Sequence, residues 1–99
     1  MKKIIESNYD SIIKRGYITP STNAFDFLDK LFEEVSELEE VINKIRDKQP
    51  SYEIFKDLHE ELADVILVCL NFARHYRIDI EQELKTKIQK NYERSRSNK

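Results

Sequence analysis

Residues 25–45 have the sequence FDFLDKLFEEVSELEEVINKI, a long amphipathic segment. Its apolar side chains recur at gaps of three and four residues: Leu28, Leu31, Val35, Leu38, Ile42 and Ile45. This spacing places them on one face of an α-helix. Thr22 or Asn23 can cap the amino end, and residues 48–50, KQP, end the segment. The pattern predicts one long helix that packs against others through its apolar face.

Shorter patterns on either side predict three more helices. Apolar residues at helical spacing predict a first helix over residues 4–13, and Gly16, the single glycine, is placed to end it. Ser51 can cap a third helix that runs to about Tyr76. A capping-box pattern at residues 79–82 opens a fourth helix. The inner apolar stripe of this fourth helix is formed by Ile80, Leu84 and Ile88.

These elements predict an all-α protein with a four-helix bundle-like fold. One glycine, two prolines and no tryptophan argue against a β-sandwich or β-barrel, which needs many turns. At 99 residues, we expect a single domain over residues 1–99 with its core at about residues 22–94.

The third helix also bears on assembly, because residues 65–73 are apolar on nearly every side. Such a helix needs cover on every side. We expect a homodimer, or a dimer of dimers, to supply it. The expected interface runs along Ala63, Ile66, Leu67 and Leu70. The alternative is a helix at the centre of a monomer.

The remaining composition limits the function. No apolar run approaches the roughly 18–20 residues of a membrane span, and the amino terminus has no secretion-signal pattern. A single cysteine, Cys69, excludes an internal disulfide, and we expect a cytoplasmic protein. Residues 26–64 hold thirteen acidic and five basic residues, whereas residues 85–99 hold one acidic and six basic residues. This asymmetry argues against a nucleic acid polymer as partner and suits divalent cations with bound phosphates.

Acidic side chains interrupt the apolar faces of the second and third helices. At about 100° per residue, Glu34 falls inside the apolar arc of its helix and Glu37 lies at the edge. Glu61 and Asp64 repeat this arrangement in the third helix. Ionised carboxylates are costly to bury unless cations neutralise them. The two pairs therefore predict a shared cation site.

The alternative is pairing with basic side chains, but Lys30, Lys44 and Lys56 do not fall on the inner arcs. Oxygen ligands suit hard cations, so we expect Mg²⁺, with Mn²⁺ as the alternative. A zinc motif is incomplete, because Ala63 stands where the HExxH-like string beginning at His59 needs its second histidine. The fourth helix offers a basic face that could contact phosphates or remain solvated: Lys87, Lys90, Asn91 and Arg94.

The string EEVSE at residues 33–37, followed by ELAD at 61–64, resembles the EExxE…ExxD signature of MazG-like nucleoside triphosphate pyrophosphohydrolases. The strings KLFEEVSELEE, EELADVILVCLNFA and KIQKNYERS extend the likeness over about residues 26–94. Ser36 stands where the family often has a glycine, and residues 1–17 show no base-reading motif.

The resemblance implies five catalytic positions, of which four ligate magnesium: Glu34, Glu37, Glu61 and Asp64. Glu33 matches a supporting residue that assists water activation. The basic residues Lys87, Lys90, Asn91 and Arg94 match the phosphate-binding end of the family.

The implied reaction hydrolyses NTP or dNTP to NMP or dNMP plus pyrophosphate, through attack of metal-activated water on the α-phosphorus. One alternative is a phosphoribosyl-ATP pyrophosphohydrolase, whose second motif usually continues with Tyr-His where this chain has Val65-Ile66. Another is a non-catalytic helical dimer that acts as a binding or regulatory module.

Overall fold

The computed structural model describes residues 1–48 and 51–97, and all regular secondary structure in them is helical. The helices are α1 (Lys2–Lys14), α2 (Ala24–Asp47), α3 (Tyr52–His75) and α4 (Ile80–Ser97). The prediction of an all-α fold with four helices is confirmed. Lys48 caps the end of α2, while the predicted breakers Gln49 and Pro50 lie outside the described residues.

Short polar side chains fix the starts of three helices. Asn23 and Asp26 form a complete capping box: Asn23 Oδ1 accepts from the Asp26 amide at 3.1 Å, and Asp26 Oδ2 accepts from the Asn23 amide at 2.8 Å. Ser51 Oγ caps α3, and Asp79 Oδ1 accepts from the Gln82 amide at 3.1 Å. After α1, Gly16 adopts a φ of +79°, which glycine tolerates better than other residues. The predicted helix boundaries therefore follow from local chemistry.

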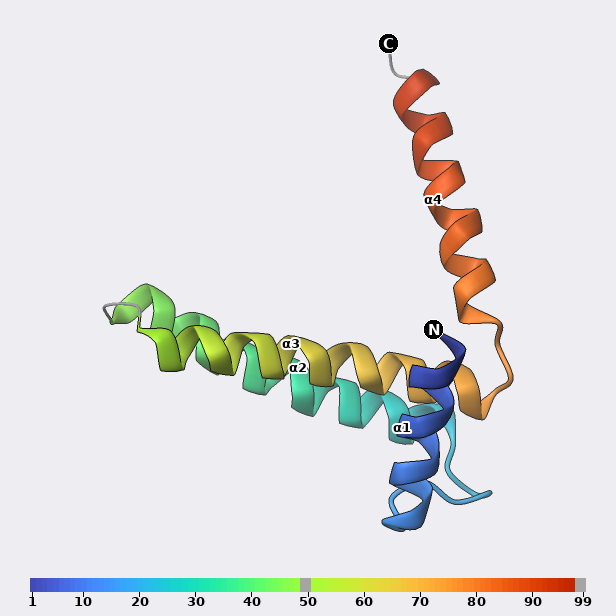
Figure 1. The fold of residues 1–99 in the computed structure, drawn as a ribbon, viewed down its shortest axis with the longest axis horizontal. Coiled ribbons are helices and arrows are strands. Elements are labelled where there is room, and N and C mark those ends of the chain that lie inside the picture. The colour runs from blue at the N-terminus through green and yellow to red at the C-terminus, as the bar shows by residue number, and fades with distance from the viewer. Residues whose placement is uncertain (49–50, 98–99) are drawn as a thin grey trace.

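The α2 and α3 helices form an antiparallel hairpin that carries most of the core (Figure 1). At its open end, Phe27 of α2 stacks on Phe72 of α3 with ring centroids 5.1 Å apart. The buried apolar side chains are Ile18, Phe27, Val41, Val68, Leu70 and Ala73. The buried residues of α2 are Phe27, Glu34 and Val41. In the predicted apolar stripe of α2, Leu28 (40%), Val35 (41%) and Ile42 (48%) are exposed, so the expectation that the whole stripe packs within the chain is wrong for these three residues.

The α1 helix packs across the carboxyl-terminal part of α3 (Figure 1). Three polar contacts hold it there: Arg74 Nε donates to Glu6 Oε1 (2.6 Å), Asn8 Nδ2 to Asn71 Oδ1 (2.8 Å) and Tyr9 Oη to His75 Nδ1 (2.8 Å). His75 Nε2 donates to the Thr22 carbonyl at 2.7 Å. Both nitrogens of His75 are thus occupied in joining α1, α3 and the α1–α2 loop.

The α4 helix points away from the hairpin (Figure 1). Its predicted inner stripe is half-buried at Ile80 but exposed at Leu84 (43%) and Ile88 (53%). The expectation that this stripe packs inside the chain is therefore wrong for those two residues. Their apolar surface is available to a second molecule.

The predicted dimer surface of α3 is likewise only partly exposed. Ala63 and Ile66 are exposed and Leu67 is half-buried, whereas Leu70 belongs to the core of the single chain.

Among the described residues, no helix combines the length and the apolar character that a membrane span requires.

Candidate metal centre

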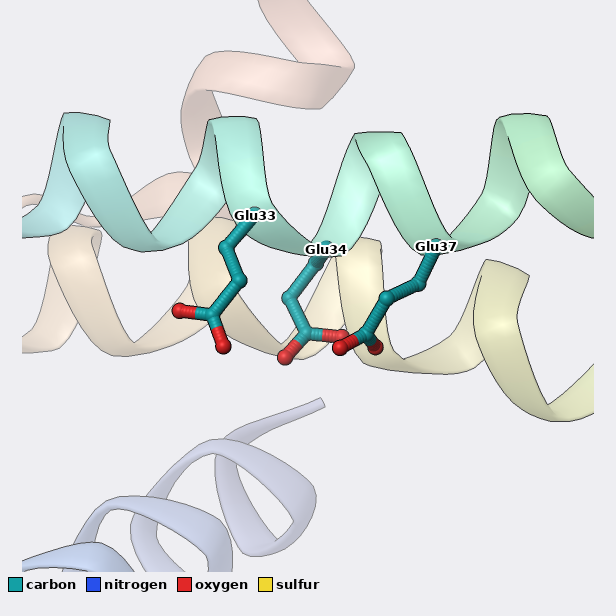
Figure 2. A group of neighbouring side chains, drawn as sticks. All are labelled: Glu33, Glu34 and Glu37. Carbon is teal, nitrogen blue, oxygen red and sulfur yellow. The ribbon is translucent and has the colours of Figure 1, made fainter.

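Carboxylates from α2 and α3 converge beside the hairpin. Glu34, Glu61 and Asp64 each offer one oxygen, and these oxygens lie within 4.8 Å of one another. Glu33, Glu34 and Glu37 form a second such group, so Glu34 belongs to both. Figure 2 shows the three α2 side chains leaving the helix on the same side, with the carboxylates of Glu34 and Glu37 drawn together. We call these five residues the acidic cluster.

The innermost oxygens of the cluster have no partner of their own. Glu34 is only 8% exposed, and Glu61 is half-buried. In the described part of the chain, Glu34 Oε2 and Glu61 Oε2 are buried without a hydrogen-bond partner. A buried unpaired carboxylate oxygen is strongly unfavourable, whereas a divalent cation accepts several such oxygens at once. These residues therefore fit an oxygen-ligated divalent cation.

Crowding of negative charge changes the acidity of the cluster. The charge of Glu34 raises the pKa of Glu37 from 4.5 to about 7, with further contributions from hydrogen bonding to Glu34, loss of hydration and Glu61. Loss of hydration also raises the pKa of Asp64, although the residue is exposed, and the Glu34 charge adds to this effect. Raised pKa values at these two carboxylates indicate that too little positive charge lies near them.

One cation already reaches the cluster, contrary to the sequence expectation. Lys30 Nζ lies 3.2 Å from Glu34 Oε1 and 3.4 Å from Glu33 Oε1. Desolvation alone would lower the pKa of Lys30, but its hydrogen bond to Glu34 and both glutamate charges raise it. The spacing of Lys30 to Glu33 and Glu34, three and four residues, was the available signal. A single ammonium leaves the inner oxygens of Glu34 and Glu61 unpaired.

The basic residues of α4 do not join the cluster within one chain. Lys87, Lys90, Asn91 and Arg94 are all exposed on a helix that leads away from the hairpin (Figure 1). A site that combines them with the acidic cluster needs a second chain or another orientation of α4.

Sequence reasoning also missed a cavity of about 840 Å³ next to the cluster. Glu33, Glu34 and Asp64 border it. The other walls come from α1, the α1–α2 loop and further residues of α2 and α3. Its volume lies within the range of small-molecule sites, roughly 300–1,000 Å³. No local pattern predicts it, because it forms only when α1 docks on α3.

The fold is an all-α structure in which an antiparallel helical hairpin brings carboxylates of both helices into one acidic cluster. The family model of the MazG nucleotide pyrophosphohydrolase domain matches residues 25–98, and the chain belongs to this family. The resemblance found in the sequence is thereby confirmed. Searches of curated proteins and of solved structures gave no match. The matched range includes the whole acidic cluster and α4, whereas α1 lies before it.

Proposed function

We propose that this protein hydrolyses NTP or dNTP to the monophosphate and pyrophosphate, with Mg²⁺ or Mn²⁺ as cofactor. The observation that carries the proposal is the pair of buried, unpartnered oxygens on Glu34 and Glu61 within a cluster of five carboxylates. Membership of the MazG family supports a nucleotide substrate. The adjoining cavity has room for a nucleotide.

In the proposed reaction, a water oxygen forms a bond to the α-phosphorus, and the bond from that phosphorus to the α–β bridging oxygen breaks. The bridging oxygen leaves with pyrophosphate. Glu34, Glu37, Glu61 and Asp64 would hold the cation. A bound divalent cation would supply positive charge to the triphosphate and make water at the site more acidic.

Glu33 is suited to take the proton from the attacking water. Its carboxylate adjoins Glu34 but is exposed, so a proton can pass on to solvent. Lys30 pairs with both carboxylates and lines the same cavity. Its ammonium would offset the charge of an incoming phosphate.

We further propose that the chain acts as a homodimer in which α4 of one copy lies next to the acidic cluster of the other. Lys87, Lys90, Asn91 and Arg94 would then contact the phosphates. The exposed apolar residues Leu84 and Ile88 on α4, and Ile66 on α3, supply surface for such an association.

A pyrophosphate-release assay over ordinary ribo- and deoxyribonucleoside triphosphates, with and without Mg²⁺, tests the activity. Glu61→Gln should abolish release while the helical circular dichroism is retained, because it removes a charge with little change of shape. Glu40→Gln, an exposed position outside the cluster, is the matched control and should stay active. Full activity of Glu61→Gln would refute the proposed site.

A further inference from the structure

We propose that the cavity between α1 and the hairpin receives the nucleoside part of the substrate, and that Asn8 and Asn71 read the base. This inference rests on the proposed function, since it assumes that the triphosphate lies at the acidic cluster. It concerns α1, a helix that precedes the residues matched by the family model.

The spacing along α3 supports this placement. Asp64, Val68 and Asn71 all line the cavity. Asp64 and Asn71 are seven residues apart, so they lie on the same face of the helix and ~10 Å apart along its axis. This span is comparable to that from the α-phosphate to the far edge of the base. Phosphates held at the Asp64 end would direct the base toward Asn71.

The Asn8–Asn71 pair brings two carboxamide groups to the wall of the cavity. Asn71 is 7% exposed and follows the apolar residues 65–70 of α3. Its Oδ1 accepts from Asn8 Nδ2 at 2.8 Å. A carboxamide has two N–H donors and a carbonyl oxygen with two lone pairs, so one mutual hydrogen bond leaves donor and acceptor capacity on both residues. Adjacent donors and acceptors are what the hydrogen-bonding edges of nucleobases require.

The contacts of α1 fall into two groups: those that only attach the helix to α3, and one that also lines the cavity. Glu6–Arg74 and Tyr9–His75 also hold α1 on α3, and none of these four residues lines the cavity. Asn8 and Asn71, which hydrogen-bond to each other, both line the cavity. Ile12 and Ile18 line the cavity beside it and offer apolar surface to a base and sugar.

The first test compares base preference in Asn8→Ala and in wild type. Pyrophosphate release is measured for a panel of nucleoside triphosphates and for ribose 5-triphosphate, which has no base. We expect kcat/KM for the preferred nucleotide to fall about 10-fold or more in Asn8→Ala, mainly through KM, and the base preference to flatten. Turnover of ribose 5-triphosphate should not change. Glu6→Gln removes the charge from an α1 contact outside the cavity and should keep the base preference of wild type.

Ile12→Trp provides a second variant, because the larger side chain occupies part of the cavity without removing a polar contact. It should raise KM for nucleotides more than for ribose 5-triphosphate, which keeps the sugar but has no base. An unchanged base preference in Asn8→Ala, or an unchanged KM in Ile12→Trp, would overturn the inference.

Binding of nucleoside monophosphates to metal-free protein separates this inference from the proposed function. We expect calorimetry to show base-dependent binding that Asn8→Ala weakens and Glu6→Gln does not. If wild type shows this binding but releases no pyrophosphate from any nucleotide, the proposed activity fails and the nucleoside site stands. If wild type releases pyrophosphate but binds all bases equally, the nucleoside site fails and the activity stands.

Discussion

Lys30 Nζ lies 3.2 Å from Glu34 Oε1, on the same helix and four residues earlier. Glu34 Oε2, the other oxygen of that carboxylate, is buried without a hydrogen-bond partner in the described residues. One carboxylate thus combines an internal counter-ion with an unsatisfied oxygen. The ammonium offsets part of the charge of the cluster and would compete with the proposed cation.

Lys30→Gln should therefore change two quantities in opposite directions. The metal-free protein should melt at a lower temperature, because repulsion among the carboxylates is less compensated. The rise in melting temperature on adding Mg²⁺ should be larger than in wild type. Thermal scans in EDTA and in Mg²⁺ measure both quantities, with Lys44→Gln, an exposed position on α2, as control. A smaller Mg²⁺-induced rise would contradict the competition.

The pKa of about 7 at Glu37 predicts how stability depends on pH. The folded state binds this proton more tightly than the unfolded state, where the pKa is near 4.5. The stabilisation from the neutral form is therefore present below about pH 4.5 and is lost as the pH rises through about 7. The raised pKa of Asp64 acts in the same sense.

In EDTA, the free energy of unfolding should fall between about pH 5 and about pH 8. Glu37→Gln should reduce this slope, which urea denaturation at several pH values measures. Saturating Mg²⁺ should oppose the fall, since cation binding requires ionised carboxylates. An equally steep fall in Glu37→Gln would show that other groups are responsible.

Binding of a divalent cation should stabilise the fold through Glu61. At Mg²⁺ concentrations about 100 times the Kd, the free energy of unfolding should increase by about 2.7 kcal/mol. Glu61→Gln should lose most of this increase and Glu40→Gln should retain it. Differential scanning calorimetry with and without Mg²⁺ gives the comparison. Equal stabilisation of the two variants would place the cation elsewhere.

A shared site between two chains predicts complementation. Glu61→Gln and Lys90→Ala should each have little pyrophosphohydrolase activity. Their equimolar mixture, after subunit exchange, should recover about a quarter of wild-type activity, because half of the dimers have one intact site of two. Glu61→Gln mixed with Asp64→Asn, both in the acidic cluster, is the control that should recover nothing. Absence of recovery in the first mixture would refute the α4 exchange.

The sequence was sufficient to predict the four helices and the helix face on which the carboxylates of Glu34 and Glu61 lie. Asn23 and Ser51 mark helix starts through local hydrogen bonds, so their effect is visible without tertiary structure. Glu34 and Glu61 interrupt apolar stripes, and the 3.6-residue period fixes the side of the helix on which they lie. The structure brings these side chains together, while their roles as ligands remain a prediction.

Three features could not be predicted from the sequence, because they depend on contacts that form only in the folded chain. Lys30 lies outside the apolar arc, and the length of its side chain lets it bridge to Glu34. The cavity depends on contacts such as Asn8–Asn71, whose partners are 63 residues apart. For α4, amphipathic spacing indicates that Leu84 and Ile88 need cover, but it does not say which surface provides that cover.

The α1 helix contributes no fully buried side chain, and polar contacts largely hold it in place. Substitutions on its surface should therefore cost little stability, whereas α2 and α3 carry the core and the carboxylates. With the proposed nucleoside site, mutations in α1 would change which nucleotide is accepted and leave the acidic cluster of α2 and α3 intact. Such a chain would evolve new selectivity by changes within its first fourteen residues.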